Sequence, residues 1–168
     1  MAGYFQRNSG SIIDMNFLFN ELQNLQAIEG KTLDTVIYQI WRNRANPAQP
    51  FDFIDKIELI LKDGPSVMLG VSEDALGITV NQQGDNTEKL KQELLSEFNG
   101  RITMHVVPMN ATELWNPTIN QVIANVKLEK LSNGTYSNEA ILLEFANHYF
   151  IEIRYHDDGL IAEFYEDV

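Results

Sequence analysis

The stretch IELILKDGPSVMLGVSEDALGITV, residues 57–80, recurs in outline as ILLEFANHYFIEIRYHDDGLIAEF, residues 141–164. In both stretches apolar residues occupy every second position, which is the period of a strand with one buried face. The turn residues also agree, because Asp74 falls on Asp158 when the two stretches are aligned. This agreement of apolar positions and turns predicts an internal duplication of antiparallel strands.

The duplication extends upstream with a shift of two residues. GKTLDTVIYQI, residues 30–40, aligns with NPTINQVIANV, residues 116–126. Each copy then has the pattern of a four-stranded meander, with strands predicted near 34–41, 55–62, 66–72 and 76–81 in the first copy and near 120–129, 139–146, 149–155 and 160–165 in the second. The segment 42–53, between the first two strands, contains prolines and is predicted to be a surface loop.

A helix is predicted ahead of each copy. Residues 14–27 and 87–98 each place apolar side chains on one helical face. Asp14 is the expected N-cap of the first helix, and Asp85 with Glu88 forms the pattern of a capping box at the second.

The predicted fold class is therefore α+β with antiparallel sheets. We expect two similar halves, 1–84 and 85–168, each consisting of a helix followed by a β-meander. The halves should pack with approximate twofold symmetry around shared apolar faces and form one compact unit. The alternating stretch RITMHVV, residues 101–107, predicts an extra strand without a counterpart in the first half, so the duplication is imperfect.

Composition sets the class of protein. The chain has 168 residues, of which 44% are hydrophobic, so it can bury a sizeable core. It has no cysteine, which excludes disulfides, thiolate metal sites and a cysteine nucleophile. No apolar run approaches the roughly 18 residues of a membrane span, and the first residues lack the apolar region of a signal peptide. We therefore expect a soluble cytoplasmic protein.

The chain is strongly acidic, with a formal net charge of −12. A surface of this sign repels phosphate backbones and anionic lipid, so we expect neither nucleic acid nor membrane as a partner. It favours a basic protein partner that is steered in by the field. The alternative, that the charge serves solubility alone, stays open.

The sequence YHDDGL raises the question of a metal site at His156. The matching stretch of the first copy is VSEDAL, residues 71–76, which keeps the acidic pair and the leucine but not the histidine. The shared part is typical of a hairpin turn. The other histidines, His105 and His148, form no metal-binding spacing with His156. We expect a solvated turn, with no metal and no cofactor.

Motifs for catalysis are missing from the sequence. It contains no GxSxG nucleophile elbow and no GxGxxG or GxxxxGK[ST] phosphate loop. Carboxylates are plentiful, yet nothing in the sequence selects a pair for acid–base chemistry. We do not expect an enzyme.

The strand near 149–155 should point Ile151, Ile153 and Tyr155 inward. The residues predicted to form an outward partner-binding face, together with the following turn and strand, are Phe150, Glu152, Arg154, His156, Asp157, Asp158, Glu163 and Tyr165. Aromatic residues and arginine are common anchors of protein interfaces.

Size, acidity and this face favour a non-enzymatic protein-binding module. The concrete hypothesis is an immunity or inhibitor protein that masks a basic toxin or enzyme. The alternative is a small-molecule binding protein with its ligand in a cleft between the two halves. The sequence does not indicate an oligomeric state.

Overall fold

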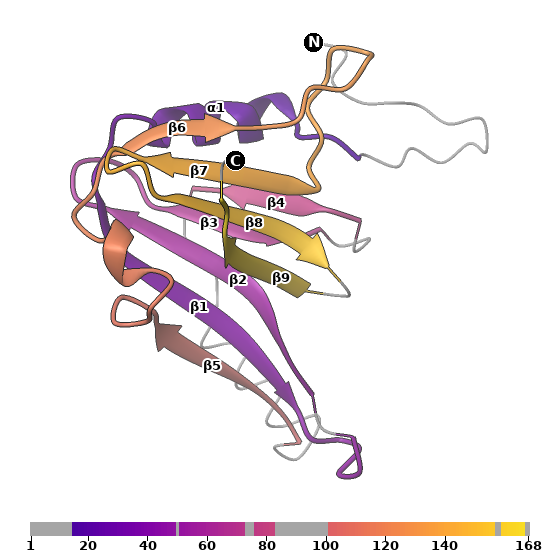
Figure 1. Cartoon of the computed structure of the whole chain (residues 1–168). Helices are drawn as coiled ribbons and strands as arrows, with labels where there is room; N and C mark the ends of the chain where they lie inside the picture. Colours follow the sequence, from indigo (N-terminus) through magenta and orange to yellow (C-terminus); the bar gives the residue numbers. More distant parts are fainter. Residues whose placement is uncertain (1–14, 50, 73–75, 83–100, 157–158, 167–168) are drawn as a thin grey trace.

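The computed structural model describes residues 15–49, 51–72, 76–82, 101–156 and 159–166. These residues form one helix, a 3-10 turn and a single antiparallel sheet (Figure 1). The elements in chain order are α1 Phe19–Ile28, β1 Leu33–Asn43, β2 Phe51–Leu61, β3 Val67–Val71, β4 Ile78–Asn81, β5 Ile102–Pro108, the 3-10 turn Asn116–Thr118, β6 Ile123–Lys127, β7 Ala140–Phe145, β8 Phe150–His156 and β9 Gly159–Phe164.

The positions of the predicted strands are confirmed. Every strand expected from the period of two has a counterpart, including β5 for the extra stretch 101–107. The predicted surface loop over 42–53 is wrong at both ends, because β1 continues to Asn43 and β2 begins at Phe51. The two strands stay paired that far, with Arg42 opposite Asp52 and Asn43 opposite Phe51.

The helix prediction is confirmed for the first helix alone. It is shorter than expected, since α1 begins at Phe19 with Leu18 at the N-cap position. The expected cap Asp14 and the second predicted helix, 87–98, lie outside the described residues.

The predicted α+β fold of two similar, helix-preceded meander halves is wrong, because the described residues form mostly antiparallel sheet with one short helix. The strands of both halves belong to one sheet, in the order β4-β3-β2-β9-β8-β7-β6, with β1 pairing β2 and β5. The physical reason is the length of β2: β3 pairs with residues 56–59 of it and leaves its beginning free for β9, at Ile54 opposite Leu160. Apolar alternation in a sequence fixes which face of a strand is buried, but not which strand lies beside it.

Gly159 makes this junction between the halves possible. A Cβ atom on Gly159 would lie 3.1 Å from the carbonyl oxygen of Ile54 and 3.1 Å from the Cβ of Phe53. A larger residue would be tight against β2, so one of the two strands would have to shift slightly to admit it.

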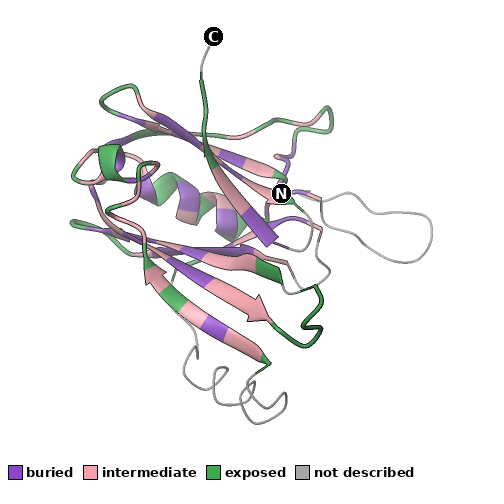
Figure 2. Ribbon diagram, turned by 60° about the horizontal axis from the view of Figure 1, so that its bottom comes forward, coloured by how far each residue is buried: buried purple, intermediate pink, exposed green. Residues whose placement is uncertain are grey.

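The sheet curls until its far end returns to β1. Thr32, just before β1, forms an isolated bridge with Val122, just before β6. The N–H of Gly30 also donates to the carbonyl of Ile123 at 2.8 Å. The result is a curled half-barrel, and Figure 2 shows α1 lying between its layers.

Two glutamates, Glu21 in α1 and Glu29 at its C-cap, bind the edge strands of the sheet. Glu21 accepts hydrogen bonds from the N–H of Val80 at 2.8 Å and from the N–H of Leu18 at 2.9 Å. Glu29 accepts one from the N–H of Val126 at 3.0 Å. Since β4 and β6 end the strand path, the helix satisfies edge groups that would otherwise be unpaired.

The interior of the half-barrel holds the core. Its largest fully buried side chain is Trp115, which precedes the 3-10 turn. The Trp115 indole N–H donates to the Tyr38 hydroxyl at 2.6 Å, and the rings meet edge to face. Asn110 lies in the segment that connects β5 to β6. Its side chain accepts the N–H of Val36 and donates to the carbonyl of Asp34, so this segment is fixed to the backbone of β1.

Candidate functional site

The predicted alternation along β8 is confirmed. Ile151 and Ile153 are fully buried and belong to the core. Glu152 and Arg154 are partly exposed on the opposite face, and His156 is exposed. β9 lies beside β8, with Glu163 opposite Glu152. We call the side of β6, β7, β8 and β9 that faces away from the core the outer face.

Arg154 holds the two carboxylates of this face together. Its guanidinium lies 3.4 Å from Glu152 and 3.3 Å from Glu163. Two like charges directly opposite each other on neighbouring strands are unfavourable, and Arg154 offsets that repulsion. All three side chains remain accessible to water, so the pairs contribute little to stability.

An aromatic cluster borders this ion network. The rings of Phe150 and Tyr165 lie 6.4 Å apart, and the Lys127 ammonium lies 5.4 Å from the Phe150 ring centre. Lys127 also pairs with Glu144 at 3.4 Å. A hydrogen bond from Asn125, together with the charge of Lys127, lowers the pKa of the Glu144 carboxyl.

Phe150 is less accessible than the sequence suggests. It lies on the predicted face but is 9% exposed, because Tyr165 and Lys127 cover it. The ring that this cluster offers to solvent is Tyr165, which is 38% exposed.

The turn interpretation of YHDDGL agrees with the strands on either side. β8 ends at His156 and β9 begins at Gly159, and these two residues are paired. Asp157 and Asp158 lie outside the described residues. Within the part of the chain that the structure describes, no group of three histidine or acidic side chains could hold a metal ion.

A shallow hollow of about 270 Å³ lies on the outer face. It is lined by Lys127, Leu128, Glu129, Ala140, Leu142 and Glu152. The two bases of this face, Lys127 and Arg154, are each paired with a carboxylate. The lining therefore combines three apolar side chains with two carboxylates and the ammonium of Lys127, which Glu144 already pairs.

Sequence reasoning missed a second cluster, at the end of the β1–β2 hairpin. Phe53 stacks with Trp41 at 6.0 Å and with Phe51 at 6.1 Å. Ile40 packs on the core, while the next residue, Trp41, joins this stack. The signal was present: Phe51 and Phe53 continue the period of two inside a segment interpreted as a loop.

Asp55 lies in β2 beyond this stack, at an irregularity in the pairing with β1. Burial raises the pKa of its carboxyl, while the charge of Lys56 and the nearby indole N–H of Trp41 act in the opposite direction. The indole N–H does not close a full hydrogen bond with any described residue, so its effect on Asp55 is weak.

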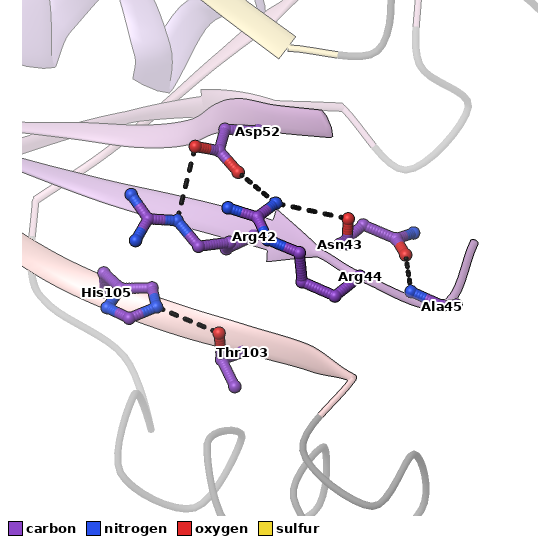
Figure 3. A network of polar contacts seen from close by, with 7 residues as sticks. All are labelled: Arg42, Asn43, Arg44, Ala45, Asp52, Thr103 and His105. Atoms are coloured by element: carbon purple, nitrogen blue, oxygen red, sulfur yellow. Dashed lines mark hydrogen bonds and ion pairs between the residues drawn. The ribbon is translucent and has the colours of Figure 1, made fainter. Parts of the chain in front are cut away.

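The charges at this hairpin end are locally basic. Arg42 and Arg44 share the single carboxylate of Asp52, at 3.3 and 3.0 Å (Figure 3). Thr103 and His105 of β5 bind each other nearby. Two guanidinium groups for one carboxylate suit an acidic partner rather than a basic one.

Comparison of the chain with protein families, with characterised proteins and with solved structures finds no match. Among the described residues, no helix is long and apolar enough to cross a membrane.

Proposed function

We propose that the protein is a non-enzymatic, acidic protein-binding module of the immunity or inhibitor type, which masks a basic toxin or enzyme. The proposed contact surface is the outer face of β8 and β9 with the turn between them. Its residues are Phe150, Glu152, Arg154, His156, Asp157, Asp158, Glu163 and Tyr165. A cytoplasmic location, without nucleic acid or membrane as partner, is part of the proposal.

The observation that carries this proposal is the position of Arg154 between Glu152 and Glu163. The face holds two carboxylates in fixed places while its own arginine is already bound. A cation on a partner can therefore join this network or displace Arg154 from it. Tyr165 beside it supplies an exposed ring of the kind that anchors interfaces.

The net charge of −12 supports the same conclusion. Charged surfaces of opposite sign accelerate association, and salt weakens the acceleration. A basic partner should therefore bind fastest at low ionic strength.

The test is an affinity capture from lysate of the native host, at low and at high salt, followed by mass spectrometry. We expect one dominant basic protein that salt releases. The double variant Glu152→Lys/Glu163→Lys should lose it. The matched control Asp34→Lys/Glu58→Lys alters the net charge equally on β1 and β2 and should retain it. Equal capture by both double variants would overturn the assignment of this face.

A hollow at the junction of the two sequence halves favours a second candidate function, small-molecule binding. It measures about 350 Å³, and Met15 and Asn16 meet the segment from Glu129 to Glu139 around it. This volume is at the lower end of the range for ligand pockets. A metabolite screen by thermal shift tests it, because a ligand of the folded state raises Tm.

A further inference from the structure

Two aromatic pairs lie on opposite faces of the sheet where β8 begins and β9 ends. Phe150 and Tyr165 form the pair on the outer face, and the N–H of Tyr165 donates to the carbonyl of Phe150 at 3.0 Å. The neighbouring residues Tyr149 and Phe164 form the other pair, with ring centres 4.9 Å apart. Successive residues of a strand point to opposite faces, which separates the two pairs.

The pair on the outer face already binds a cation of the chain itself. Lys127 lies over the Phe150 ring, and Glu144 pairs with the same ammonium. An aromatic face and a carboxylate together thus hold a cation supplied by the chain itself.

The pair of Tyr149 and Phe164 also combines an aromatic face with a nearby carboxylate. Tyr149 and Phe164 line a hollow of about 530 Å³ together with Glu113 and Leu114. Phe164 is 54% exposed, so one of its faces is accessible. Glu113 and Tyr149 line the same hollow, and burial together with the charge of Glu113 raises the pKa of the Tyr149 hydroxyl. Within the described residues, no lysine or arginine forms an ion pair with Glu113 or lies over either ring.

We propose that this hollow takes an arginine side chain of a basic protein partner. The guanidinium would lie on the Phe164 ring and donate to the Glu113 carboxylate, while its methylene groups contact Leu114. Arginine fits better than lysine because its flat, weakly hydrated group stacks on rings and donates in a fixed fork. This inference rests on the proposed function and names the chemistry that one part of the partner must present.

The test uses the full-length protein and three small probes: the N-acetyl amides of arginine, lysine and citrulline. Citrulline has nearly the shape of arginine without its charge. We expect arginine amide to shift the ring resonances of Tyr149 and Phe164 saturably in aromatic NMR spectra, lysine amide to do so more weakly, and citrulline amide to have no effect. Phe164→Leu keeps an apolar side chain without a ring, and Glu113→Gln removes the charge. Each should weaken arginine binding about two- to fivefold.

Glu58→Gln, a change of the same kind on β2, is the matched control and should bind as the wild type does. Unchanged Tm values would show that the variants fold. Arginine shifts confined to Phe150 and Tyr165 would overturn the hollow as a site and leave the proposed function standing. Equal binding of citrulline and arginine, or no saturable shift, would also overturn the inference, while the lysate capture decides the proposed function independently.

Discussion

The carboxylate of Glu21 accepts the backbone N–H of Val80 at 2.8 Å and so fixes α1 to the edge strand β4. Its other oxygen accepts the N–H of Leu18 at the beginning of the helix. One buried side chain therefore satisfies a helix end and a sheet edge together.

Replacing Glu21 should be costly. Glu21→Ala leaves the N–H of the buried Val80 unpaired and removes the cap of α1. We expect a loss of about 2–4 kcal/mol in the free energy of unfolding. Glu21→Gln keeps one acceptor and should lose about half as much. Urea unfolding measures both, and Gln23→Ala, at an exposed position of the same helix, is the control that should change little. A Glu21→Ala variant as stable as that control would disprove the role of the carboxylate.

The buried pair of Trp115 and Tyr38 gives a second prediction. Tyr38→Phe removes the oxygen that accepts the indole N–H and leaves that donor unpaired in the core. We expect a loss of about 1–3 kcal/mol, measured by thermal or urea unfolding. Tyr155→Phe, which removes a hydroxyl from a partly buried tyrosine of β8, should cost less. Equal losses in both variants would argue against this hydrogen bond as the cause.

Tyr38 also predicts a dependence on alkaline pH. Burial raises the pKa of its hydroxyl above the ordinary value of 10.0. In the unfolded chain the hydroxyl ionises first, so its contribution to stability is complete below pH 10.0 and is lost as pH rises through the folded pKa. Unfolding measured from pH 9 upward should therefore show a steeper decline in the wild type than in Tyr38→Phe. Parallel curves would contradict the shift.

Asp55 predicts a pH dependence of the same sign in the acidic range. Burial raises the pKa of this carboxyl above its ordinary 3.8, so the charged form is disfavoured in the folded protein. The group's contribution to stability is present below pH 3.8 and is lost as pH rises through the folded pKa. Asp55→Asn should therefore stabilise the protein at pH 7, and the difference from wild type should shrink towards acidic pH. A variant less stable than wild type at pH 7 would show that the charge of Asp55 is compensated in the fold.

Gly159 gives a prediction about the junction of the two halves. The methyl group of Gly159→Ala would meet the backbone of β2 at 3.1 Å, and the strand must shift to admit it. We expect a loss of about 1–3 kcal/mol in a denaturant titration. Gly64→Ala adds a methyl that meets only the flexible Lys31 side chain and should be tolerated. If the two variants unfold alike, close approach at Gly159 is not limiting.

The strands could be predicted from sequence because their signal is local. Alternation over 57–61 and 141–145 fixes a buried face wherever the strand is placed. The strand order could not be predicted, because it depends on which edge β2 leaves free and on the lack of a side chain at Gly159. The pairing of β2 with β9 joins residues about a hundred positions apart, and the spacing of apolar residues within each strand carries no information about it.

The candidate face was predictable in part for the same reason. Glu152, Arg154 and Glu163 lie together because alternation and hairpin pairing place them so. The covering of Phe150 by Tyr165 and Lys127 was not predictable, since it depends on contacts across strands. The stack at Trp41 was missed because two prolines in segment 42–53 suggested a loop, although the strands continue on both sides of them.

We propose that the carboxylates beside Arg154 attract a basic partner. The most direct measurement is the association rate constant with the partner recovered by salt elution, at several ionic strengths. Arg154→Gln frees Glu152 and Glu163 and should raise the rate at low salt, whereas Glu152→Gln/Glu163→Gln should lower it. All rates should converge at high salt. Rates that are equal at low salt, or a slower Arg154→Gln variant, would show that these carboxylates do not attract the partner.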